Sequence, residues 1–152
     1  MKIDEILTPG RTCSNLSASS KKKAIEFISQ KISSSDPLLV TGQVYRGLID
    51  REKLGTTAIG EGVAIPHCRL AKCKKTIGGL FVFSDPIDFS APDDRGVRIV
   101  FALVVPEQES NEHLRTLSML ASGFSSLETR QRLMTAGSND ELYQAALAIG
   151  AD

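Results

Sequence analysis

Two long apolar runs constrain the fold of this 152-residue chain more than any other feature. Residues 77–83 and 97–105 contain the segments GGLFVF and IVFALVV, which carry no polar side chain. Continuous apolar runs of this length are typical of central strands that are buried on both faces. The segment between them, 84–96, is rich in proline and aspartate and is predicted to be a surface connection. We therefore expect a sheet with helices packed against both of its sides.

The segments before these runs indicate two helices. Ser20 precedes residues 21–33, whose apolar side chains recur at helical spacing, and serine is a favoured N-cap. A second helix is predicted to start at Asp36, with Pro37 at its first helical position, and to stop at Gly55. Shorter strands are predicted at residues 13–16, 56–59 and 63–65.

The last third of the chain is predicted to be helical, beginning with a helix that Asn111 caps. No repeat, low-complexity tract or linker divides the sequence, and its length suits one domain. The predicted fold is therefore a single α/β domain over residues 1–152. Two further helix starts are indicated by serine–glutamate pairs with capping-box spacing, Ser125 with Glu128 and Ser138 with Glu141.

The charge balance and the first residues argue against several classes of partner. The chain has 18 basic and 18 acidic residues, without the basic surplus of a protein whose main partner is nucleic acid or an acidic membrane. The start lacks the layout of a signal peptide, and no apolar run approaches the roughly 20 residues of a membrane span. Three irregularly spaced cysteines indicate reduced thiols. We expect a cytoplasmic protein with no nucleic-acid partner and no direct membrane insertion.

The glycine-rich segment GTTAIGEGVAIPHC is the part of the sequence most suggestive of chemistry. Gly60 and Gly62 allow sharp turns and the close approach of another molecule. Pro66 biases Ile65 to an extended conformation, so His67 follows a rigid strand. A histidine pKa of about 6.5 leaves a neutral, nucleophilic nitrogen at cytoplasmic pH. A turn histidine held by a backbone hydrogen bond is the alternative interpretation, and the local residues do not decide between the two.

Six segments spread over nearly the whole chain carry a family resemblance. They are residues 20–23, 51–57, 59–67, 86–89, 101–106 and 113–114. Together they resemble the mannitol/fructose-type IIA proteins of the bacterial phosphotransferase system, and most closely the stand-alone nitrogen-regulatory branch. The fold that this resemblance implies is a mixed β-sheet between helical layers, which agrees with the predicted order of elements.

The resemblance implies a phosphocarrier. His67 matches the phosphorylated histidine of the family, which accepts a phosphoryl group from a phosphohistidine on an HPr-type carrier protein. Arg51 matches the active-site arginine, whose paired donors suit the oxygens of a transferring phosphoryl group, and His113 matches the second active-site histidine. Because the histidine nitrogen is itself the nucleophile, no metal and no cofactor are expected. The motif also implies binding positions at Thr57, Gly60 and Gly62.

Other interpretations of these residues stay open. Arg51 is also favoured near the end of a helix by the helix dipole, and His113 also fits a surface position. Cys68, which replaces a residue that is commonly glycine, and Cys73 fit small apolar fillers. A metal site formed by these cysteines with His67 and His113 is a further alternative. Another is a redox-sensitive thiol at Cys68 that is acidified by Lys72, Lys74 and Lys75.

The expected partners follow from the function. An HPr-type phosphocarrier protein is expected for the phosphocarrier, and a IIB domain or regulated target proteins such as a transporter or a kinase are the other candidate partners. The alternatives are a sugar-specific IIA that passes its phosphate to a cysteine of a IIB domain, and a docking module without phosphate turnover. The absence of a fused IIB or membrane domain in 152 residues favours the regulatory version. The lysine-rich stretches 21–23 and 72–75 fit either a solvated surface or a docking patch for acidic partners.

Overall fold

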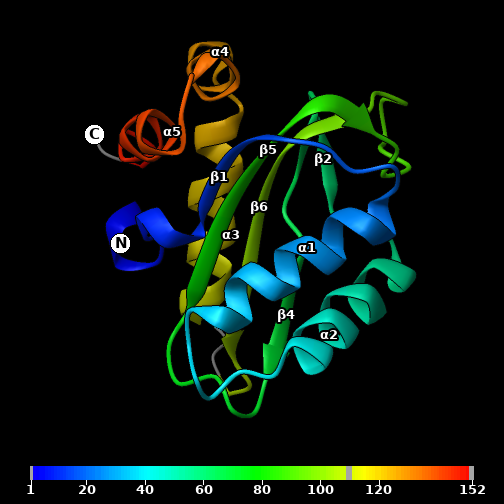
Figure 1. The fold of residues 1–152 in the computed structure, drawn as a ribbon, viewed down its shortest axis with the longest axis vertical. Coiled ribbons are helices and arrows are strands. Elements are labelled where there is room, and N and C mark those ends of the chain that lie inside the picture. The colour runs from blue at the N-terminus through cyan, green and yellow to red at the C-terminus, as the bar shows by residue number, and fades with distance from the viewer. Residues whose placement is uncertain (1, 109–110, 151–152) are drawn as a thin grey trace.

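The computed structural model describes residues 2–108 and 111–150, which form one six-stranded sheet and five α-helices (Figure 1). The strands are β1 (Thr12–Leu16), β2 (Ala58–Gly60), β3 (Val63–Ala64), β4 (His67–Leu70), β5 (Ile77–Ile87) and β6 (Val97–Pro106). The helices are α1 (Lys21–Ser34), α2 (Thr41–Leu54), α3 (Asn111–Phe124), α4 (Leu127–Thr135) and α5 (Asn139–Ala146). Two short 3₁₀ helices, Ile3–Glu5 and Pro9–Arg11, precede β1.

The sheet is mixed, as the resemblance implies. Its order is β1-β5-β6-β3-β2, and β4 also pairs with β6. The pairs β1–β5, β3–β6 and β4–β6 are parallel, whereas β5–β6 and β2–β3 are antiparallel. The strands β3 and β4 therefore lie against successive parts of β6, with Val63 opposite Ile99 and His67 opposite Leu103.

The two apolar runs form the central strands β5 and β6, and their alternate residues face two separate cores. In β6, Val100, Ala102 and Val104 join the core formed with α1 and α2, while Phe101 and Leu103 join the core formed with α3, α4 and α5. Figure 1 shows α1 and α2 on one face of the sheet and α3 on the other. The prediction of central strands covered by helices on both sides is confirmed, and the period-two alternation of a strand explains why both sets of residues must be apolar.

Several predicted helix boundaries are confirmed. The hydroxyl of Ser20 accepts a hydrogen bond from the Lys23 amide at 3.1 Å and caps α1. Ser138 caps α5 in the same way through the Glu141 amide at 3.1 Å, and α2 ends at Gly55. Within the described residues, no helix is both long and apolar enough to cross a membrane.

Two predicted helix starts are wrong. The second helix begins at Thr41 and not after Asp36, because the Asp36 carboxylate accepts a hydrogen bond from the Leu38 amide at 2.9 Å and closes a local turn. The helix α4 is capped by Ser126, whose hydroxyl accepts from the Thr129 amide at 3.2 Å, and not by Ser125. Asp and Ser form such local bonds in turns as readily as at helix caps, so these signals located the helices but not their first residues.

Three further differences concern the strands and α3. The strand β4 was not predicted, because its sequence, HCRL, is short and half polar. The strand β5 continues to Ile87, into the segment expected to be a surface connection. Asn111, the expected cap, is the first residue of α3, and the residue before it lies outside the described residues.

Candidate functional site

The backbone before β4 fixes the position of His67. The Ile65 amide donates to the Thr57 carbonyl at 3.0 Å, and the Pro66 carbonyl accepts from the Leu103 amide at 2.9 Å. His67 then opens β4, which pairs with β6, and no other described strand pairs with β4. The histidine is thus held at an edge of the sheet, half-buried, by a backbone that is bonded on both sides.

The ring of His67 is held in one orientation. Its Nδ1 lies 2.7 Å from the Ile65 carbonyl oxygen. Because a carbonyl can only accept, Nδ1 carries the proton, and the neutral ring keeps its lone pair on Nε2. Burial lowers the pKa of His67; the Ile65 bond and Glu52 oppose this shift, while Arg51 and Arg69 add to it. The ring is therefore neutral at pH 7, with Nε2 available as a nucleophile.

One face of α2 lies against this histidine. Gly47, Asp50, Arg51 and Leu54 follow the i, i+3, i+4, i+7 spacing of a single helix face, and all four line the pocket that contains His67. The guanidinium of Arg51 donates from Nη1 to the Gly55 carbonyl at 2.9 Å, just beyond the end of the helix. Arg51 thus combines the helix-end position expected of a cation with a place beside the histidine.

The second histidine lies beside the first. His113 is in the first turn of α3, and its ring centroid is 5.3 Å from that of His67, with the planes tilted by 53°. Its side chain is buried, so the alternative of a surface histidine is wrong. The structure brings together His67, Arg51 and His113 from three separate elements.

These residues line an open pocket of about 380 Å³. Its lining also includes Cys68 and Arg69 of β4. Leu54 lines the pocket and is 85% exposed, and Leu114, the residue after His113, is 63% exposed.

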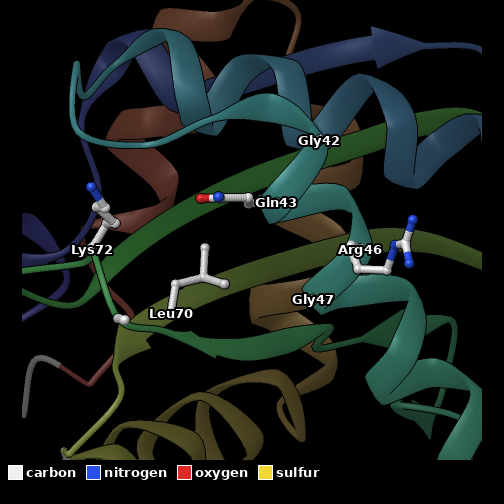
Figure 2. Close-up of a pocket in the computed structure, with 7 residues that line it drawn as sticks. Gly42, Gln43, Arg46, Gly47, Leu70 and Lys72 are labelled. Carbon is white, nitrogen blue, oxygen red and sulfur yellow. The ribbon is translucent and has the colours of Figure 1, made fainter.

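A second pocket continues along the contact between α2 and β4 (Figure 2). It measures about 520 Å³ and shares Gly47 with the first pocket. Figure 2 shows Arg46 and Lys72 at its two ends, with Gln43 and Leu70 between them. Lys72 belongs to the lysine-rich stretch 72–75, which adds positive charge to the end of the second pocket where Lys72 lies.

The three predicted binding positions do not line the histidine pocket. Gly60 and Gly62 have positive φ values of 94° and 77° and form the turn between β2 and β3. A side chain at Gly60 would contact Asp93, which shows that this turn packs against the loop before β6. Thr57 is buried, and its hydroxyl donates to the carboxylate of Glu52.

The two chemical alternatives for the cysteines find no support. Burial raises the pKa of the Cys68 thiol to about 12, so the alternative of a thiol acidified by lysines is wrong. Cys68 and Cys73 both lie in the apolar core with α1 and α2, as small fillers do. Within residues 2–108 and 111–150, no group of three or more His, Cys, Asp or Glu side chains could hold a metal ion.

Sequence reasoning missed several residues of this site. Gly47, Asp50 and Leu54 could have been found from the helical spacing to Arg51, once that residue was assigned to the site. Arg69 follows His67 by two residues and therefore lies on the same face of β4. The sequence did not indicate this shared face, because β4 was not predicted. Glu52 lies in a segment that carries the family resemblance, but the sequence did not indicate that its carboxylate is buried beneath the site.

Comparison with known proteins places this geometry in a family. The family model described as "Phosphoenolpyruvate-dependent sugar phosphotransferase system, EIIA 2" matches residues 5–148. The chain belongs to this family. The resemblance noted from the sequence is therefore confirmed, and the fold and the position of the motif agree with it.

Individual relatives show which members of the family this chain is similar to. The chain is 36% identical over 149 residues to the "Nitrogen regulatory protein" of Pseudomonas aeruginosa, covering 98% of this chain and 97% of that one. The crystal structure of the nitrogen regulatory protein IIA-Ntr from Neisseria meningitidis matches with a TM-score of 0.88 at 38% identity, covering 95% of this chain and 98% of that one. The IIA protein in a complex of mannitol IIA with phosphorylated IIB from Escherichia coli shares the fold, with a TM-score of 0.74 at 22% identity and coverage of 93% and 98%.

Proposed function

We propose that this IIA protein is a cytoplasmic phosphocarrier that accepts a phosphoryl group on Nε2 of His67 from the phosphohistidine of an HPr-type carrier protein. Its phosphorylation state then regulates the proteins to which it binds. The observation that carries the proposal is the orientation of His67, since the Ile65 carbonyl holds the proton on Nδ1 and leaves Nε2 as the nucleophile.

The proposed phosphoryl transfer needs no cofactor. The P–N bond of the donor histidine breaks as a new P–N bond forms at Nε2 of His67, and the lone pair left on the donor nitrogen restores its neutral ring. The His67 ring gains positive charge while Nδ1 keeps its proton, and the Ile65 carbonyl stabilises that charge. The guanidinium of Arg51 is suited to the phosphoryl oxygens in the loose transition state of such reactions, and His113 to a further hydrogen bond.

The surroundings of His67 support a protein partner. Leu54 provides exposed apolar surface in the lining of the pocket, and apolar side chains next to a polar centre are common where proteins dock. A face of this kind fits the convergence of two proteins on one histidine, because the donor's own histidine must reach Nε2.

The regulatory version is favoured over sugar transport. Two relatives that match over nearly the whole chain at 36% and 38% identity are named nitrogen regulatory proteins. The mannitol IIA that was studied with phosphorylated IIB shares the fold at lower identity. A IIB domain is therefore the second candidate for a partner, which would receive the phosphate on a cysteine.

The test is phosphorylation in a reconstituted system. The protein is incubated with phosphoenolpyruvate, enzyme I and an HPr-type carrier, and acid-labile phosphate is measured by intact mass spectrometry. We expect complete labelling of the wild-type protein and none of His67→Ala. The matched control His113→Ala also removes an imidazole but should label more slowly to the same final extent.

Three results would overturn parts of this proposal. Absence of label from every carrier tested would contradict phosphate turnover and leave docking alone. Label that persists in His67→Ala would contradict the assigned histidine. Rapid transfer of the label to an added IIB protein would favour the sugar-transport function over the regulatory one.

A further inference from the structure

Glu52 is a buried carboxylate that the proposed chemistry does not use. Only 4% of its side chain is exposed. Its Oε1 accepts hydrogen bonds from the Thr57 amide, at 3.1 Å, and from the Thr57 hydroxyl. Its Oε2 lies 3.1 Å from the ammonium group of Lys21. A buried carboxylate is costly unless it is paired and hydrogen-bonded, so a fully partnered one marks a constrained part of the structure.

The bonds of Glu52 join three segments that are distant in sequence. Lys21 is the first residue of α1, Glu52 lies in the last turn of α2, and Thr57 precedes β2. Thr57 is also bonded to the segment that carries the histidine, since its carbonyl accepts from the Ile65 amide at 3.0 Å. The carbonyl of Ile65 in turn holds Nδ1 of His67 at 2.7 Å. A continuous chain of hydrogen bonds therefore leads from Glu52 to the imidazole.

A second connection leads to Arg51. The loop 55–57 begins at Gly55, whose carbonyl accepts the Nη1 hydrogen bond of Arg51 at 2.9 Å. Because Glu52 fixes the other end of this loop at Thr57, it restrains the acceptor that orients the guanidinium. The nucleophile and the phosphoryl-binding cation thus depend on the same buried carboxylate, although Glu52 does not line their pocket.

We propose that Glu52 is a positioning residue for phosphoryl transfer at His67, acting through Thr57 on the Ile65 carbonyl and through the loop 55–57 on Arg51. This inference rests on the proposed function. It assigns Thr57 a supporting place in the site, in contrast to a direct contact with the phosphoryl group. It also gives Lys21 a role that its place in a lysine-rich stretch conceals, because its charge neutralises a buried carboxylate.

The experiment compares three single variants. Glu52→Gln removes the charge and keeps the shape of the side chain. Thr57→Val removes one hydrogen bond to Glu52 without changing any charge. Glu26→Gln is the matched control, because Glu26 also pairs with a lysine, Lys23 at 3.5 Å, but on the exposed side of α1.

Two quantities are measured for each folded variant: the rate of phosphorylation by the HPr-type carrier, and the pKa of His67 followed by NMR in the free protein. The charged and titratable groups that face His67 are Asp50, Arg51 and Glu52 of α2, Arg69 of β4 and His113 of α3. Glu52 raises the pKa of His67, so Glu52→Gln should lower it.

We expect Glu52→Gln to slow phosphorylation by roughly 10- to 100-fold, the scale of loss for a misplaced reacting group. Thr57→Val should slow it by about tenfold without moving the pKa of His67, because only geometry changes. Glu26→Gln should change neither quantity.

The outcomes separate this inference from the proposed function. A folded Glu52→Gln protein that is phosphorylated at the wild-type rate would overturn the positioning role and leave Glu52 as a tie between α1 and α2. If Glu52→Gln does not fold, a wild-type rate for Thr57→Val would overturn it equally. Failure of the wild-type protein to accept phosphate would instead contradict the proposed function, and the pKa of His67 could still be measured without a carrier.

Discussion

The centre and the edge of the sheet are built under different physical constraints. The central strand β6 is buried along residues 99–105 and carries no charge there. The edge segment 58–70 consists of three short strands joined by a tight turn, with a positive φ of 58° at Glu61, and ends in the half-buried His67 and the exposed Arg69. We therefore expect stability to depend mainly on the centre, and the proposed chemistry on the edge. Substitutions in the two regions should separate the two properties.

The largest effect is expected from a substitution in the centre. Phe101→Ala removes a fully buried ring that packs against Phe124, with centroids 6.2 Å apart. The free energy of unfolding, measured with urea, should fall by about 3–5 kcal/mol because a large cavity is created. The protein that remains folded should accept phosphate at the wild-type rate. A slower rate of phosphorylation in the folded Phe101→Ala protein would contradict the separation of stability from chemistry.

The largest effect at the edge is expected from Arg51. Arg51→Ala should lower the rate of phosphorylation by about 10²–10³-fold, as for the loss of one electrostatic donor in an active site. The free energy of unfolding should change by less than about 1 kcal/mol, because the side chain is not in the core. Arg51→Lys is the control that keeps the charge without the paired donors. Its rate of phosphorylation should lie between the rates of the wild-type protein and of Arg51→Ala.

The affinity for the partner protein distinguishes a role of Arg51 in the chemical step from a role in binding. The affinity for the HPr-type carrier is measured by titration calorimetry with the unphosphorylated proteins. We expect Arg51→Ala to weaken it less than it slows transfer. Strong loss of binding together with an intact chemical step would show that Arg51 contacts the partner and not the phosphoryl group.

A smaller effect should arise where α2 meets the edge strand. A side chain at Gly47 would place its Cβ 2.9 Å from Sγ of Cys68, so Gly47→Ala should push α2 away from β4. Overpacking costs about 1–3 kcal/mol, and the higher helix propensity of alanine offsets about 1 kcal/mol of this. We expect a modest net loss of stability and a slower transfer, because α2 also carries Arg51.

Gly42→Ala is the matched control for this contact. It lies in the same helix, but its Cβ would meet nothing within 4 Å, so it should stabilise the protein by up to about 1 kcal/mol. The second substitution Cys68→Ala should partly rescue Gly47→Ala in a double-mutant cycle. Independent effects of the two substitutions would show that the helix and the strand are not in tight contact.

The smallest effect concerns pH. Burial lowers the pKa of His67 below its ordinary 6.5, and in the proposed function the neutral ring is the nucleophile. The rate of phosphorylation should therefore fall as the pH is lowered, with a midpoint below pH 6.5. The unfolded chain binds this proton more readily, so folding stability should also decline as the pH falls through 6.5. A midpoint above 6.5 in the rate profile, after correction for the carrier, would contradict the assigned environment.

The sequence predicted the centre better than the edge, for a physical reason. The runs in β5 and β6 are apolar because both faces are buried, and this pattern is local. The caps Ser20 and Ser138 are local signals too. By contrast, β4 exists because its four residues pair with a strand more than 30 residues away, which no local pattern records.

The site shows the same division. The resemblance to a family supplied His67, Arg51 and His113, and the structure brings them to one pocket. The alternative of an acidic Cys68 thiol is wrong because sequence proximity to lysines does not reveal burial, which dominates its pKa. Glu52 stayed hidden for a related reason, since its partners Lys21 and Thr57 come from different elements and meet it only in the folded chain.

The central claim is that the edge of the sheet presents Nε2 of His67 as the nucleophile. It is tested most directly by long-range ¹H–¹⁵N NMR of the protein phosphorylated by an HPr-type carrier, which identifies the nitrogen that bears phosphorus. We predict phosphorus on Nε2 of His67, with Nδ1 still protonated and bonded to the Ile65 carbonyl. Phosphorus on Nδ1 of His67, or on His113, would contradict the account.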